Sequence, residues 1–313
     1  KDDSGNAHIA SKLLNFQLTR RTKKEPLSDT NPWLIGFPSL SLMKQLPILI
    51  ESNFTVVRVD QELNNPNIRK VAQVYSKGTI DSTQSDSNNY LCIIVASFEN
   101  KMYSYGISKI DLTTGDVIIT ETHFYDNVHE AFEYIHTKVE SILPNELVIF
   151  TNADELTISK FKKLFIRKPN VQPIKSECND IIYQNEFLHR VYNVNVQESP
   201  IEYLNLERYK LGTLALIHSF EFIKFHNQKL LANLKIPFIE HNDQYLCLVN
   251  SPLYQLGICT HKVDEVSLFS IINHTSTGMG KRLLYNQITN PYINIGKISP
   301  ILEDVELMVK YKL

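Results

Sequence analysis

The fold of this chain is decided by the apolar run YLCIIVASF, which occupies residues 90–98. Two more strand-like runs follow it closely, YSYGISKIDL at 103–112 and VIITETHF at 117–124. The turn residues Thr113-Thr114-Gly115-Asp116 separate the last two runs and predict a hairpin. The segment therefore predicts three consecutive antiparallel strands.

A helix, a strand and a second helix are expected directly after this hairpin. Apolar residues recur with a helical period over 127–143, the run ELVIF at 146–150 is short and continuous, and 156–165 again has a helical pattern. Three antiparallel strands that lead into this succession predict a mixed sheet with helices on its faces.

The polar stretch DSTQSDSNN at 81–89 predicts a linker that separates this sheet from a small α/β unit before it. In that unit we expect a helix near 8–16, a basic strand end at 17–24, and strands at 54–59 and 69–75. Gly36 and Pro38 are expected as turn residues, and Ser39 or Ser41 as the N-cap of a helix over 42–52.

A helical texture begins near residue 201. We expect one long helix over 203–233, extended pieces at 244–250 and 253–260, and helices at 265–273 and 281–288. The last residues before Leu313 have the pattern of a further helix that has just begun, so we expect a fragment of a longer protein. The predicted fold class is α/β plus α, in three parts: 1–80, 88–200 and 201–313.

Composition gives an ordinary globular balance, with 43% hydrophobic and 21% charged residues. The net charge of −2 requires any affinity for nucleic acid to come from a local basic patch. The best patch is formed by Arg20, Arg21, Lys23 and Lys24, which can neutralise several phosphates. No signal peptide is recognisable in 1–15, so we expect an intracellular protein without a membrane segment. The cysteines lack zinc-ligand spacing and are expected to be buried reduced thiols: Cys92, Cys178, Cys247 and Cys259.

Three stretches resemble the MutS family of DNA mismatch-repair proteins, in the family's order. The segment SLFSIINHTSTGMGKRLLYNQITNP at 267–291 is similar to the signature that begins the core and lever helices. The run GISKID at 106–111, continued by Thr114-Gly115 and Glu121, resembles the connector-domain pattern, with Ser108 where that pattern has Ala.

The third stretch resembles the latter part of the mismatch-binding domain. It begins with Gly36-Phe37-Pro38 and continues through 59–61, 69–71 and 78–79. On these three stretches the chain is identified as a member of the MutS family from about residue 8 to residue 313. Its Asn-, Ile-, Lys- and Tyr-rich texture looks most similar to the subfamily of giant viruses and octocoral mitochondria.

The resemblance implies a function in mismatch recognition and repair signalling as part of a homodimeric clamp on double-stranded DNA. It implies a partial mismatch-binding domain at 1–80, a ribonuclease H-like connector at 88–200 and the start of a helical core and lever at 201–313. Downstream repair proteins are the implied partners, and the parent protein is implied to be an ATPase that uses ATP and Mg²⁺. The implied structural signature residues are Gly36, Pro38, Asp111, Gly115, Thr277, Met279, Gly280 and Arg282.

Two family motifs are missing from this sequence. The Phe-x-Glu wedge that inserts at a mismatch is expected upstream of Lys1, because Phe16 is followed by Gln17-Leu18. The stretch Gly278–Arg282 is no P-loop, since it lacks both the four-residue spacing and the Ser or Thr after the lysine. We therefore expect neither a catalytic site nor a metal site in this chain, and no cofactor of its own.

Other readings of single residues stay open at this stage. A metal-dependent nuclease needs clustered carboxylates, but Asp111, Asp116 and Glu121 are scattered around a hairpin. His218 is expected to be a hydrogen-bonded core or groove residue. Lys281 and Arg282 are expected at a helix start, where their charge calls for a carboxylate or phosphate partner.

Two alternative functions remain. A junction- or recombination-binding MutS relative lacks the wedge, although such relatives usually lack the whole first domain. A viral scaffold protein that keeps the fold for protein contacts would be indifferent to DNA.

Overall fold

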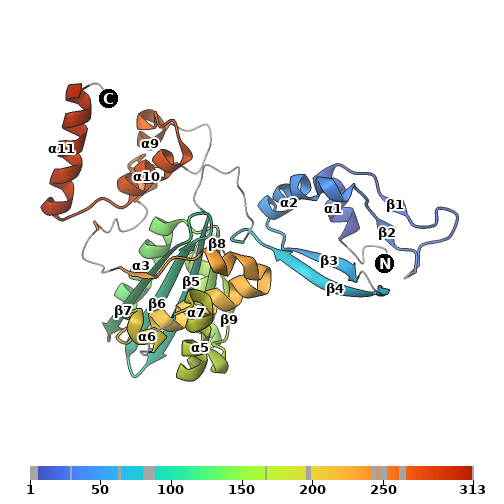
Figure 1. Ribbon diagram of the computed structural model, residues 1–313, viewed down its shortest axis with the longest axis horizontal. Helices are drawn as coiled ribbons and strands as arrows, with labels where there is room; N and C mark the ends of the chain where they lie inside the picture. Colours follow the sequence, from blue (N-terminus) through green and yellow to red (C-terminus); the bar gives the residue numbers. More distant parts are fainter. Residues whose placement is uncertain are drawn as a thin grey trace. The chain divides into compact units, whose positions relative to one another are not determined.

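The computed structural model describes residues 6–28, 30–62, 65–79, 89–165, 168–194, 199–240, 245–246, 252–260 and 266–311 (Figure 1). The chain divides into two compact units, one formed by 1–80 with 225–227 and the other by 81–224 with 228–313.

The first unit combines two helices with two separate antiparallel strand pairs. A small core of Leu46, Ile50 and Tyr75 joins the second helix to the longer strand pair. The helix expected at 42–52 and the strands expected near 54–59 and 69–75 are present. The elements in order are α1 (Ala7–Leu14), β1 (Thr19–Arg20), β2 (Trp33–Leu34), the 3-10 helix η1 (Ser39–Ser41), α2 (Leu42–Glu51), β3 (Val56–Glu62) and β4 (Asn65–Tyr75).

The N-cap position of α2 is one of the two predicted from the sequence, but the side-chain cap is not formed. Ser41 occupies the N-cap position, but its side chain makes no capping hydrogen bond. The 3-10 helix η1 leads directly into α2, and the backbone N–H of Ser41 donates to the carbonyl of Pro38 at 2.8 Å.

The second unit is built on a six-stranded mixed sheet of order β10-β7-β6-β5-β8-β9. Strand β6 pairs antiparallel with both β5 and β7. On the other side of β5, β8 pairs parallel with β5 and β9 parallel with β8, while β10 pairs parallel with β7. The mixed sheet expected from the sequence is thus confirmed. Its strands are β5 (Tyr90–Glu99), β6 (Met102–Asp111), β7 (Asp116–Tyr125), β8 (Glu146–Thr151), β9 (Asn170–Gln172) and β10 (Phe238–Ile239).

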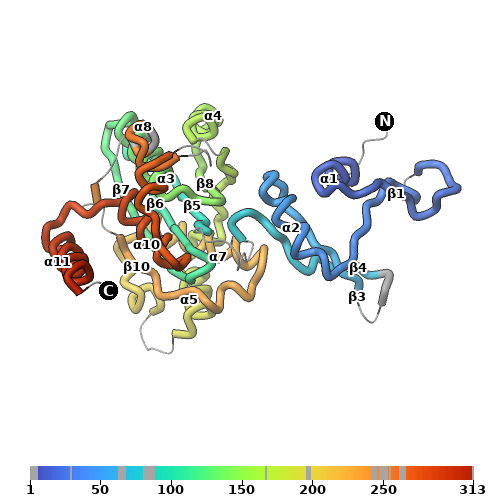
Figure 2. Tube along the Cα trace, turned by 90° about the horizontal axis from the view of Figure 1, so that it is seen from above, coloured from blue at the N-terminus to red at the C-terminus, as the bar shows by residue number. Residues whose placement is uncertain are grey.

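Helices cover both faces of this sheet, as Figures 1 and 2 show. One face packs on α3 (Val128–Ile142) and α4 (Glu155–Leu164), the other on α5 (Ile181–Tyr192), α6 (Pro200–Tyr203) and α7 (Lys210–Asn227). Along β5 the odd-numbered residues from Leu91 enter one core and the even-numbered residues from Cys92 enter the other. A strand that is buried on both faces reads as a continuous apolar run, which is why 90–98 predicts the fold.

The single long helix expected over 203–233 is wrong. A capping box between Ser199 and Glu202, with Pro200 in the first turn, starts the short α6, which ends at Tyr203. Asn205 then adopts a left-handed φ of 57°, which breaks the helix before α7 begins. The 3-10 helix η3 (Gln228–Asn233) follows α7. Apolar spacing alone did not reveal this interruption, because Leu204 and Leu206 on either side of it are also buried.

Residues after 250 are helical wherever the structure describes an element. The extended piece expected at 253–260 is wrong, since α8 (Pro252–Gln255) lies there; of the piece expected at 244–250 only 245–246 are described, and Tyr245 bridges to Tyr292. The expected later helices are α9 (Leu268–Ile272), α10 (Gly278–Thr289) and α11 (Ile295–Tyr311). In the described part of the chain, no helix is both long and apolar enough to cross a bilayer. Cys92, Cys178 and Cys259 are buried and free, and Cys247 lies outside the described residues.

Candidate nucleic-acid interface

The basic loop, residues 20–26 between β1 and β2, is organised by one buried side chain. Asn31 is only 2% exposed, and its Nδ2 donates to the carbonyls of Thr22 at 3.0 Å and of Glu25 and Pro26 at 3.3 Å. Its Oδ1 accepts from the backbone N–H of Thr22 at 3.1 Å. The Asn31 amide therefore binds the start of the loop at Thr22 and its end at Glu25 and Pro26.

Arg20 faces the inside of the same loop. Its guanidinium lies 5.3 Å from the centre of the Trp33 ring, and its two terminal nitrogens donate to the carbonyls of Glu25 at 3.1 Å and Lys23 at 3.4 Å. Two of the donors that the sequence offered to phosphates are thus engaged by the chain itself.

Arg21, Lys23 and Lys24 are exposed. Among the residues that the structure describes, no carboxylate forms an ion pair with any of the three. Three unpaired cations within four positions of an ordered loop can neutralise phosphates without reading base sequence.

The connector-like pattern at 106–121 serves to seat α7 on the sheet. A Cβ on Gly106 would lie 2.1 Å from the backbone carbon of Leu211, so β6 and α7 meet backbone to backbone. Glu121 in β7 accepts a hydrogen bond from the N–H of Gly212 through Oε2 at 2.8 Å, while its Oε1 lies 3.1 Å from Nε2 of His123.

The hairpin between β6 and β7 is stabilised by hydrogen bonds within the turn and by contacts with the end of η3 and the residues that follow it. Buried Asp111 accepts from the N–H of Thr113 at 2.9 Å and from its hydroxyl at 2.6 Å. Gly115 has a φ of +76°, and a Cβ there would lie 2.2 Å from the carbonyl oxygen of Asn233. Lys235 donates its N–H to Gly115 and its Nζ to Asp116, both at 2.8 Å.

The signature of 267–291 meets this hairpin. Thr277 caps α10 by accepting from the N–H of Gly280 at 3.1 Å, and Met279 is 77% exposed. Nη1 of Arg282, the fifth residue of α10, donates to Oγ1 of Thr113 at 3.0 Å. The hydroxyl of Thr113 is thus one partner of this cation.

Gly36 and Pro38, the two residues carried over from the third stretch, differ in importance. Pro38 leads into η1, as its φ of −59° allows. Gly36 has no left-handed φ, and a Cβ there would meet no described atom within 4 Å. Gly36 was expected as a turn residue, but nothing described around it requires a glycine.

Three buried side chains of the second unit, those of Tyr105, Ser108 and His218, carry polar atoms without a hydrogen-bond partner in the described part of the chain. His218 stacks on Phe150 with ring centres 3.9 Å apart, and burial lowers its pKa to about 4. It is a core residue as expected, but the expected hydrogen bond is not formed. The hydroxyl of Ser108, which stands where the family pattern has Ala, is also unpartnered.

The carboxylates considered for a nuclease have structural partners. Asp111 binds Thr113, Asp116 binds Lys235 and Glu121 caps α7. Within the described ranges, no three His, Cys, Asp or Glu side chains are grouped so that they could hold a metal ion.

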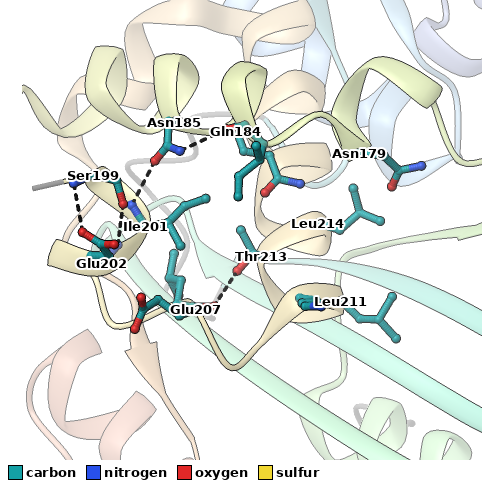
Figure 3. A pocket seen from close by; sticks show the side chains of 13 residues that line it. Asn179, Gln184, Asn185, Ser199, Ile201, Glu202, Glu207, Leu211, Thr213 and Leu214 are labelled. Atoms are coloured by element: carbon teal, nitrogen blue, oxygen red, sulfur yellow. Dashed lines mark hydrogen bonds between the residues drawn. The ribbon is translucent and has the colours of Figure 1, made fainter.

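A pocket of about 440 Å³ lies between α5, α6 and α7 (Figure 3). Its labelled polar side chains mostly serve the helix ends. Oδ1 of Asn185 accepts from the N–H of Ile201 at 3.2 Å, and the hydroxyl of Thr213 donates to the carbonyl of Leu206 at 3.3 Å. These contacts assign the side chains to helix packing.

Comparison with known proteins gives a consistent set of relatives, although no family model matches the chain. A putative DNA mismatch repair protein, a mutS homolog of Acanthamoeba polyphaga mimivirus, is 30% identical over 324 residues, which cover 89% of this chain and 29% of that protein. The DNA mismatch repair protein MutS of Borreliella burgdorferi strain ZS7 is 29% identical over 315 residues, covering 96% of this chain and 33% of that protein.

The DNA mismatch repair protein MutS of Methanococcoides burtonii is 25% identical over 316 residues, covering 96% of this chain and 34% of that protein. The chain thus spans about a third of the length of the curated relatives it matches. It belongs to the MutS family and is homologous, over most of its length, to the N-terminal third of MutS proteins.

Proposed function

We propose that this chain recognises mismatched double-stranded DNA and relays repair signals as the N-terminal part of a MutS-type clamp. The observation that carries the proposal is homology over 89–96% of the chain to proteins that are named for DNA mismatch repair. The basic loop supplies a matching local feature, because a chain of net charge −2 must confine its phosphate contacts to a patch.

In this proposal Arg21, Lys23 and Lys24 contact the DNA backbone. Their ammonium and guanidinium groups are exposed and have no ion-pair partner among the described residues. Arg20 keeps its charge near the same surface but uses two donors to hold the loop. Such contacts fix the position of the protein on the duplex and leave the choice of mismatch to other residues.

The three-part division of the chain is part of the proposal. Residues 1–80 would be a partial mismatch-binding domain, 88–200 a ribonuclease H-like connector, and 201–313 the start of the core and lever, although α7 and β10 of this last part complete the sheet and one of its cores. The strand order of the sheet supports the connector assignment, because β5 is central, β6 and β7 extend it antiparallel, and β8 and β9 extend it parallel. The hydrogen bond from Arg282 to Thr113 supports a direct link from α10 to this sheet.

ATP and Mg²⁺ would act in the parent protein, as a homodimer that recruits downstream repair proteins. No motif of this chain has the spacing of a P-loop, so the chain itself would not hydrolyse ATP. Its contribution would be to hold DNA and to transmit the state of the clamp.

The test is a measurement of duplex binding across a series of salt concentrations, with a homoduplex and with the same duplex carrying one G·T mismatch. The triple variant R21Q/K23Q/K24Q should bind both duplexes more weakly, and its plot of log affinity against log salt should be shallower by about 2 to 3. The matched control K160Q/K162Q/K163Q removes three exposed charges from α4 and should behave as the wild type.

Other outcomes decide between the alternatives. Equal slopes for the wild type and the loop variant would contradict the phosphate contacts. A protein indifferent to DNA and to salt would favour the scaffold alternative. With a four-way junction added as a third substrate, preference for the junction over both duplexes would favour the recombination-type relative.

A further inference from the structure

We infer that Asn31 is a positioning residue for DNA binding: it fixes the shape in which the basic loop presents Arg21, Lys23 and Lys24 to phosphates. The inference rests on the proposed function, because it deepens the role of the same loop. It concerns an uncharged, buried residue that the basic sequence pattern does not single out.

The amide of Asn31 binds several groups of the loop at once. Its two N–H hydrogens serve three carbonyls, those of Thr22, Glu25 and Pro26, so at least one hydrogen is shared. Its oxygen accepts the N–H of Thr22. The loop also contains a turn in which the N–H of Glu25 approaches the carbonyl of Thr22 at 3.4 Å.

Arg20 binds the loop from its other end. Arg20 ends β1, Asn31 precedes β2, and together they hold the carbonyls of four loop residues: Thr22, Lys23, Glu25 and Pro26. With these carbonyls turned toward the two clamping side chains, the side chains of Arg21, Lys23 and Lys24 remain exposed.

Order in the free loop favours DNA binding energetically. A loop that is ordered before it meets DNA loses less backbone entropy on binding than a free segment of the same charge. Loss of the Asn31 amide would therefore weaken phosphate binding without changing the net charge. A purely electrostatic patch would not respond to such a change.

The experiment compares N31A in the full chain with N31A placed in the R21Q/K23Q/K24Q background, using a fluorescein-labelled homoduplex at several salt concentrations. We expect N31A alone to weaken binding about fivefold and to flatten the salt dependence, because fewer cations engage phosphates together. In the triple background N31A should have no further effect on affinity, since the groups that it positions have been removed.

A second variant guards against simple misfolding. R20K keeps the positive charge but replaces the planar fork that reaches two carbonyls and stacks on Trp33. It should weaken binding in the same direction as N31A and should likewise become silent in the triple background. The control T79V removes buried hydrogen bonds to Ser76 in the same unit and should leave affinity and salt dependence unchanged.

The inference is overturned if N31A binds as the wild type does, if its loss persists at full size in the triple background, or if T79V causes an equal loss. A triple variant with unchanged binding would overturn the phosphate site itself, and this inference with it. If R21Q/K23Q/K24Q binds DNA weakly while N31A alone binds as the wild type does, the proposed function stands and only the role of Asn31 is refuted.

Discussion

The carboxylate of Glu121 in β7 accepts the backbone N–H of Gly212, 91 residues later in the chain, at 2.8 Å. A strand residue thus binds one of the free N–H groups at the start of α7, a helix whose N-cap residue Tyr209 provides no side-chain cap. The side chain of Glu121 is 6% exposed, so little solvent screens its interaction with the helix end. This bond links the sheet to the helix that covers one of its faces.

Replacing Glu121 should therefore destabilise the second unit. E121Q keeps an acceptor but loses the charge and should cost about 1 kcal/mol, and E121A should cost about 2 kcal/mol because the N–H of Gly212 is left unbound. Urea denaturation measures both. E133Q, at an exposed position of α3, is the matched control and should change the free energy of unfolding very little.

The tip of the β6–β7 hairpin should tolerate no side chain. G115A combines a left-handed φ with a Cβ 2.2 Å from the carbonyl oxygen of Asn233, and should cost more than about 2 kcal/mol. G257A has a similar φ of +65° but no described atom near its Cβ, and should cost only about 1 kcal/mol. Equal effects of the two substitutions on thermal unfolding would contradict the close contact of the hairpin with Asn233.

Removing the hydroxyl of Ser108 should stabilise the protein. This oxygen is buried without a partner among the described residues, so S108A should raise the free energy of unfolding by about 1 kcal/mol. Ser219 is equally buried, but its hydroxyl donates to the carbonyl of Ala215 at 2.8 Å, and S219A should give no such gain. Destabilisation by S108A would show that its hydroxyl has a partner.

His218 should make stability depend on pH. Burial lowers its pKa from 6.5 to about 4, so the unfolded chain takes up the proton first as the pH falls. The contribution of His218 is complete above its unfolded pKa and is lost progressively toward pH 4, reaching a loss of about 2 kcal/mol near pH 5. Urea titrations of the wild type and of H218F, which can keep the stack on Phe150, should diverge in this window. Parallel curves would mean that His218 is not buried as the neutral form.

The hydrogen bond between Arg282 and Thr113 should appear as a coupling energy. R282Q, T113V and the double variant form a cycle, and the two losses should fall short of additivity by about 1 kcal/mol. A second cycle of R282Q with T113S is the control, because serine keeps the hydroxyl that accepts from Arg282 and changes only the volume of the side chain. If the two losses of stability in the first cycle are additive, the side chains of Arg282 and Thr113 do not stabilise each other, and α10 is held without help from the hairpin.

The sequence predicts the centre of the sheet well and its surroundings poorly. β5 and its neighbours are evident because both of their faces are buried, which leaves continuous apolar letters. The helix α5 was missed, since Ile181 and Ile182 at its start are exposed and disturb its apolar period. The edge strands β9 and β10 have only three and two residues, too few for a pattern.

The candidate site was predicted only as a charge pattern. Four cations in five positions stand out in any reading of 20–24, but the inward turn of Arg20 depends on Trp33, and the loop shape depends on Asn31. Both contacts cross the loop, so they follow from folding and not from local spacing. The family resemblance singled out Asp111, Gly115 and Arg282, but only the structure shows what each of them contacts.

The place of β10 beside β7 has a consequence for dissecting this protein. A fragment cut after residue 200 would lose both the two residues that pair with the edge of the ten-residue β7 and the α7 side chains that cover Leu91, Ile93 and Val95. Its bare strand edge and uncovered apolar face would invite self-association. The shortest piece that can be handled alone as a well-behaved sheet therefore extends to Glu240, well past the point where the sheet's other strands are complete.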